Sequence, residues 1–73
     1  MFTNQEIQKL TAYLQQKFKN PGFTIKPRDK ANDSVEVLLN DEFIAVIYKD
    51  TDEGETSYDM NMAILDIDLE SAA

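Results

Sequence analysis

The sequence predicts an α+β fold in which one N-terminal helix packs on a four-stranded antiparallel sheet. Two patterns predict this fold. Apolar residues recur at helical spacing in the first twenty positions, and they alternate with polar residues along most of the chain from residue 23 to residue 69. A length of 73 residues allows a single domain, residues 1–73, with one small core. The chain contains no cysteine, so no disulfide strengthens that core, and domains of this size often gain stability from a second subunit.

The expected helix covers residues 4–19. Thr3 and Glu6 form the sequence pattern of a capping box, in which the side chain of each residue bonds the backbone N–H of the other. Pro21 ends the helix, because proline disfavours a helical conformation in the residue before it. One face of the helix is apolar and is expected to lie on the sheet; it consists of Ile7, Leu10, Leu14 and Phe18.

Three strands with period-two alternation follow the helix. They are expected at residues 23–28, 34–39 and 42–49. If residues 29–33 form the loop between the first two strands, Lys26 lies opposite Glu36. The same register places Ile25 opposite Val37, so charged groups pair with each other and apolar groups pair with each other.

Asn40 and Asp41 form the expected turn into the third strand, because both residues tolerate the left-handed conformation of a tight hairpin. A two-residue turn places Ile44 and Val46 on the helix side of the sheet. The opposite face then holds four apolar residues: Leu38, Phe43, Ala45 and Ile47. One helix cannot cover both faces, so we predict that this second face is the interface of a homodimer. The alternative is a turn one residue longer, which would bring the last three of these residues to the helix side.

The fourth strand is expected at residues 57–69, with a bulge where the apolar alternation shifts phase. A C-terminal helix is the alternative, giving the order α-β-β-β-α, because Tyr58 and Met62 also share one helical face with two later leucines. We favour the strand because Asp66 and Asp68 would lie unfavourably near a helix C-terminus. The end of this strand is a candidate edge for pairing with another protein strand, formed by Leu65, Ile67 and Leu69.

Basic and acidic residues are separated along the chain. Residues 1–31 hold six of the seven basic residues, whereas residues 32–73 hold twelve of the fourteen acidic ones. The basic half offers an alternative function, nucleic-acid binding, through Lys17, Lys19, Lys26, Arg28 and Lys30. The net charge of −7 opposes this alternative, because the acidic half would repel a phosphate backbone.

The sequence lacks the residue sets that enzymes use. It contains no histidine, no nucleophile with a matching base, and no glycine-rich phosphate loop, so we expect no enzymatic activity and no catalytic residue, cofactor or metal. The acidic turn offers oxygen ligands for Ca²⁺, but its spacing differs from that of an EF-hand loop, and we interpret it as a solvated turn; it contains Asp50, Asp52, Glu53 and Glu55. The chain has no apolar run long enough for a membrane helix, and we expect a cytoplasmic protein.

The order of several segments resembles a family of small alphaproteobacterial proteins of unknown function. The resemblance covers about residues 6–70 and is most specific in the second half of the chain. The segments that carry it include Asn40-Asp41-Glu42-Phe43-Ile44, Tyr48-Lys49-Asp50, Asp52-Glu53-Gly54-Glu55 and Met62-Ala63-Ile64-Leu65-Asp66-Ile67-Asp68-Leu69-Glu70. The resemblance implies a bacterial cytoplasmic protein and carries over no activity or site residue.

The function that we expect rests on the residues themselves. The apolar second sheet face and the separated charges favour a non-enzymatic protein-interaction module that acts as a homodimer.

Overall fold

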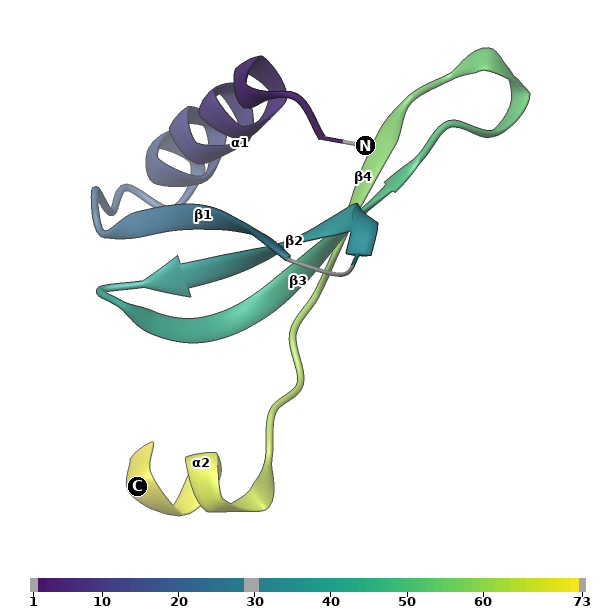
Figure 1. Cartoon of the computed structure of the whole chain (residues 1–73). Helices are drawn as coiled ribbons and strands as arrows, with labels where there is room; N and C mark the ends of the chain where they lie inside the picture. The colour runs from purple at the N-terminus through teal and green to yellow at the C-terminus, as the bar shows by residue number, and fades with distance from the viewer. Residues whose placement is uncertain (1, 29–30, 73) are drawn as a thin grey trace.

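The computed structural model describes residues 2–28 and 31–72. Figure 1 shows one helix above a twisted antiparallel sheet and a short second helix at the far end of the chain. The strands are hydrogen-bonded in the order β1-β2-β3-β4. The predicted helix on a four-stranded antiparallel sheet is therefore confirmed. The elements in chain order are α1 (Asn4–Lys17), β1 (Phe23–Arg28), β2 (Ala31–Leu39), β3 (Glu42–Asp50), the 3₁₀ turn η1 (Asp52–Gly54), β4 (Ser57–Asn61) and α2 (Asp66–Ala72).

The capping box at the start of α1 is present as predicted. The Thr3 backbone N–H donates to Glu6 Oε1 at 2.9 Å, and the Glu6 backbone N–H donates to Thr3 Oγ1 at 3.1 Å. The helix ends at Lys17, two residues earlier than expected, because Lys19 adopts the left-handed conformation that terminates helices (φ 53°). The Gly22 backbone N–H then donates to Asn20 Oδ1 at 2.8 Å, which fixes the turn into β1.

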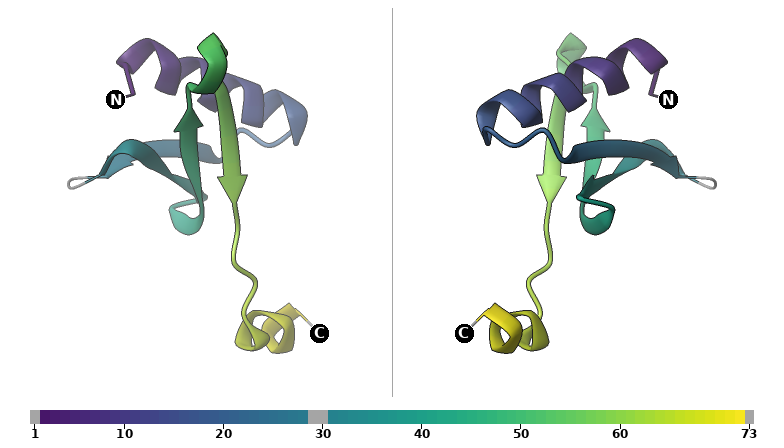
Figure 2. Two further views of the ribbon diagram at one scale, coloured as in Figure 1. Left: turned by 90° about the vertical axis from the view of Figure 1, so that its right-hand side faces the viewer. Right: turned by 90° about the vertical axis from the view of Figure 1, so that its left-hand side faces the viewer.

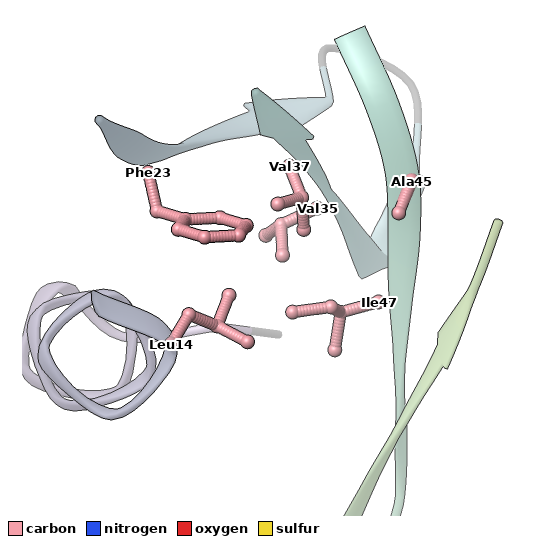
Figure 3. Close-up of a cluster of buried hydrophobic side chains, with 6 residues drawn as sticks. All are labelled: Leu14, Phe23, Val35, Val37, Ala45 and Ile47. Atoms are coloured by element: carbon pink, nitrogen blue, oxygen red, sulfur yellow. The ribbon is translucent and has the colours of Figure 1, made fainter. Parts of the chain in front are cut away.

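The core lies between α1 and one face of the sheet. Figure 3 shows six buried side chains that point into this layer from α1, β1, β2 and β3: Leu14, Phe23, Val35, Val37, Ala45 and Ile47. Phe18, at the end of α1, stacks on Phe23 with ring centroids 5.4 Å apart. Burial of an apolar side chain of this size stabilises a fold by about 1.5–3 kcal/mol, so a handful of side chains accounts for the helix–sheet contact.

The first hairpin has the predicted register. Ile25 pairs with Val37 and Lys26 pairs with Glu36. The strand β2 begins at Ala31 rather than at residue 34, and the pairing shifts between Pro27 and Arg28. Residues 29 and 30 of the expected loop lie outside the described residues.

The second hairpin has the predicted turn but a different register. Asn40 and Asp41 are both left-handed, with φ values of 52° and 69°, as a two-residue hairpin turn requires. Leu38 pairs with Phe43, whereas Val37 pairs with Ala45, so Ile44 is an extra residue in β3.

This extra residue is a β-bulge, and it changes which residues of β3 lie on the open face of the sheet. Two consecutive residues of β3 oppose one residue of β2, and the alternation of the strand reverses after that point. Ala45 and Ile47 therefore lie in the core, where 1% and 2% of their surface is exposed. Their predicted place on the open face is wrong, although the two-residue turn on which that prediction rested is right.

The predicted fourth strand is right only in its first part. The strand β4 ends at Asn61, which pairs with Val46, and the chain leaves the sheet there. Residues 66–72 form a helix, as in the alternative, so the strand prediction is wrong for this segment. The helix begins at Asp66, which places Asp66 and Asp68 in its first turn, where carboxylates complement the helix dipole. Asp68 Oδ2 also accepts the Leu65 backbone N–H at 3.0 Å.

The two side views of Figure 2 show that α1 lies on one face of the sheet and that α2 stands apart from both layers. Within the part of the chain that the structure describes, no other helix or strand packs against α2. The molecule is accordingly elongated, with principal extents of 43 × 23 × 23 Å.

Two alanine substitutions in neighbouring residues of β3 test the register. Ile47→Ala should lower the free energy of unfolding by about 2–5 kcal/mol, because it removes a side chain from the core. Val46→Ala should cost under about 1 kcal/mol, because Val46 points to the opposite face. Urea unfolding at one protein concentration measures both values. A larger loss for Val46→Ala would show that the bulge is absent.

Candidate interaction site

The structure divides the four residues of the predicted sheet-face interface. Ala45 and Ile47 are in the core, Leu38 is 8% exposed, and Phe43 is 55% exposed. Tyr48 follows the core residue Ile47 and therefore faces away from α1, and the bulge at Ile44 brings Phe43 to this same open face. The open face therefore keeps a smaller apolar surface than the sequence predicted.

The predicted edge residues Leu65, Ile67 and Leu69 do not form a strand. They belong to a segment that we call the C-terminal arm, residues 62–72, which consists of a connection and α2. The edge strands of the sheet are instead β1 and β4. Five large apolar side chains of the arm are between 53% and 65% exposed: Met62, Ile64, Leu65, Ile67 and Leu69.

A hollow of about 190 Å³ lies between α1 and β4, and we call it the helix–strand groove. It forms because α1 packs on β1 and leaves the β4 side of the same sheet face uncovered. Three side chains remain exposed along it: Tyr13 of α1, Phe18 directly after α1, and Met60 of β4. Its lining residues are Leu10, Tyr13, Leu14, Lys17, Phe18, Ile47, Tyr58 and Met60.

A second hollow, of about 610 Å³, lies between the start of β3 and the C-terminal arm. Phe43 and Ile44 line it from the sheet, and Met62 and Leu65 are among the arm residues that line it. Its charged lining residues are acidic: Glu42 and Asp68.

Glu6 joins the start of α1 to the β3–β4 hairpin at one end of the groove. Its Oε2 atom lies 2.7 Å from Lys49 Nζ and also accepts the Tyr58 hydroxyl hydrogen. Lys49 and Tyr58 are directly opposite each other in the antiparallel ladder, so the sheet presents both groups to the same carboxylate. The Phe2 ring completes this Glu6 cluster, 6.0 Å from the Tyr58 ring and 6.0 Å from Lys49 Nζ.

These contacts change the pKa values of Glu6 and Tyr58. The Lys49 ammonium, followed by the Tyr58 hydroxyl and the Thr3 backbone N–H, lowers the pKa of Glu6 from 4.5 to about 2. The hydrogen bond to the Glu6 carboxylate raises the pKa of Tyr58 above 10.0. The sequence identifies Glu6 only as a helix cap. No local pattern connects it to Tyr58, which is 52 positions away.

The described basic residues of the alternative function belong to the end of α1, the turn after it and β1. Lys17 lines the groove at the end of α1, whereas Arg28 stands at the far end of β1, where it donates to Ser34 Oγ at 3.3 Å. Lys26 lies opposite Glu36. Lys19 follows α1, and Lys30 lies outside the described residues.

The acidic turn folds on itself. Asp50 Oδ1 accepts the Asp52 backbone N–H at 2.9 Å, and η1 follows directly. Among residues 2–28 and 31–72, no group of three or more acidic side chains is placed to hold a metal ion. None of the described helices is long and apolar enough to cross a membrane.

Removal of the Glu6 charge should reduce stability in a pH-dependent way. The pKa of Glu6 is lower in the folded state than its ordinary value of 4.5, so its stabilising effect is complete above pH 4.5 and disappears as the pH falls towards 2. Glu6→Gln retains a side-chain acceptor for the capping box. The difference in the urea midpoint of unfolding between the parent chain and Glu6→Gln should therefore shrink as the pH falls from 4.5 towards 2. Glu42→Gln, which removes one carboxylate from the end of β3 away from Lys49, is the matched control for the change in net charge.

The partners of Glu6 should contribute unequally to its acidity. Lys49→Met should raise the pKa of the Glu6 carboxyl more than Tyr58→Phe does, because the Lys49 contact lowers it most. A carbon-13 NMR titration of the Glu6 side chain measures both shifts. Equal shifts, or a larger one for Tyr58→Phe, would contradict this order.

Comparison with known proteins supports the predicted family. A family model described as "Protein of unknown function (DUF3126)" matches residues 6–68. No curated protein and no solved structure matches the chain. The matched segment runs from the Glu6 cluster through the whole sheet into α2. Because the family model covers most of its length, this chain belongs to the DUF3126 family of proteins of unknown function.

Proposed function

We propose that this chain is a non-enzymatic protein-interaction module that acts as a homodimer. The observation that carries the proposal is the C-terminal arm, whose five large apolar side chains are each more than half exposed. Large apolar side chains that are exposed together in one segment are typical of a surface that a partner covers.

The size of the domain supports the same proposal. The core consists of a handful of side chains, and the chain has no cysteine for a disulfide. A core of this size supplies only about 3–5 kcal/mol of stability, and association with a second copy is a common way to add to it.

The Glu6 cluster supports a structural role rather than catalysis. Both Glu6 oxygens accept hydrogen bonds, and the lowered pKa makes this carboxylate a poor base near neutral pH. The raised pKa of Tyr58 makes its hydroxyl a poor acid there. Shifts of this kind also arise in ion-pair networks that only hold a fold together.

The oligomeric state tests the proposal. Light scattering over a dilution series should give twice the monomer mass at high protein concentration, both in low salt and in 1 M salt. An apolar contact persists in 1 M salt, whereas a contact made by exposed charges is screened. A monomer at every concentration would overturn the homodimer, and a dimer found only in low salt would place the contact on the charged surfaces instead.

A further inference from the structure

We propose that the homodimer forms by reciprocal exchange of arms, in which the C-terminal arm of each copy lies in the helix–strand groove of the other. This inference rests on the proposed homodimer and specifies its contact. The structure contains both halves of the contact: an extended arm with exposed apolar side chains and a groove lined by apolar side chains.

The arm needs a surface to pack on. An isolated helix of seven residues is marginal in water, because the cost of nucleation exceeds the gain from so few hydrogen bonds. Most helices in proteins gain their stability by packing an apolar face. Leu65, which directly precedes α2, and Leu69 are four positions apart and form such a face at the start of the helix, and both are exposed.

Charge selects the groove over the second hollow. The arm carries three carboxylates, Asp66, Asp68 and Glu70. Lys17 lines the helix–strand groove, and Lys9 lines the adjoining hollow on α1, so both bases stand along the path of an acidic arm. Glu6 also lines that hollow, but its carboxylate is paired with Lys49. The hollow beside β3 is instead flanked by Glu42, which would repel the arm of a second copy.

The direction of the chain favours a second copy over the arm's own groove. The strand β4 runs past α1 and continues away from it, and the arm leaves the sheet on the side opposite to α1 (Figures 1 and 2). To reach its own groove, the chain would have to reverse direction after Asn61. Residues 62–65 contain no glycine or proline, the residues that most favour such a reversal. These four residues are long enough, at about 13 Å when extended, to carry α2 to a neighbour.

Two-fold symmetry makes the contact self-complementary. In a two-fold dimer each copy gives one arm and receives one, so two identical contacts close the assembly and no arm is left exposed. The three carboxylates of each arm then lie near Lys9 and Lys17 on α1 of the other copy.

Point substitutions test which surfaces take part. Leu69→Ser in the arm and Met60→Ser in the groove should each raise the dissociation constant of the dimer at least tenfold, as measured by sedimentation. Tyr48→Ser is the matched control, because Tyr48 is similarly exposed but lies on the open sheet face; it should change the constant less than threefold. The arm lies outside the core, so Leu69→Ser should leave urea unfolding of the dilute monomer unchanged. A dimer weakened by Tyr48→Ser but not by Leu69→Ser would overturn the exchange.

A spin label places the arm directly. The chain has no cysteine, so Glu70→Cys provides one site for a nitroxide. Spin-labelled chains at natural isotope abundance are mixed with nitrogen-15 chains that carry no spin label. Exchange should broaden the nitrogen-15 amide signals of Leu10, Tyr13 and Met60 and leave that of Thr24 sharp.

Each alternative gives a different pattern. A second sample carries the nitroxide and the nitrogen-15 on the same chain and is diluted with protein that carries neither. If the broadening appears only in this sample, the arm folds back onto its own groove and the exchange is overturned. Broadening centred on Tyr48 would place the arm on the open sheet face and would also overturn it. A dimer without any broadening in the groove refutes the exchange alone, whereas a monomer at every concentration refutes the homodimer itself.

Discussion

The extra residue at Ile44 decides which residues of β3 face the core. Without this bulge, strict alternation would turn Val46 towards α1 and leave Ile47 on the open face. With it, Ile47 points to the same side as the inward residues of β2, and Leu14 of α1 has an apolar surface to cover. The Glu6 cluster and the lining of the groove depend on this one irregularity, because it turns Lys49 and Ile47 to the side of α1.

Local patterns were sufficient to predict the elements that depend on neighbouring residues. Thr3 and Glu6 predict the start of α1, and Asn40 with Asp41 predicts the second turn, because each signal is complete within a few positions. The bulge was not predictable in this way. An extra residue leaves the apolar pattern of β3 unchanged and alters only the partner to which each residue pairs.

The last fifteen residues show a second limit of pattern analysis. Asp-Ile-Asp-Leu alternates as a strand does. The alternation does not reveal that the pairing of β4 with β3 ends after Asn61. Once the chain leaves the sheet, Asp66 and Asp68 favour a helix that starts beside them. The groove and the Glu6 cluster were missed for a related reason. Each joins residues that are far apart in the sequence, and no local pattern in either segment predicts the contact with the other.

The contact between Glu6 and Tyr58 also bears on how the domain folds. The helix α1 and the first two hairpins can form from local pairs, but this contact closes a loop of more than fifty residues and needs the β3–β4 hairpin in place. It is therefore one of the last contacts available to a chain that emerges from the ribosome N-terminus first. Until Tyr58 arrives, the first turn of α1 has its own cap but no attachment to the far side of the sheet, and nascent chains that end before β4 lack this restraint.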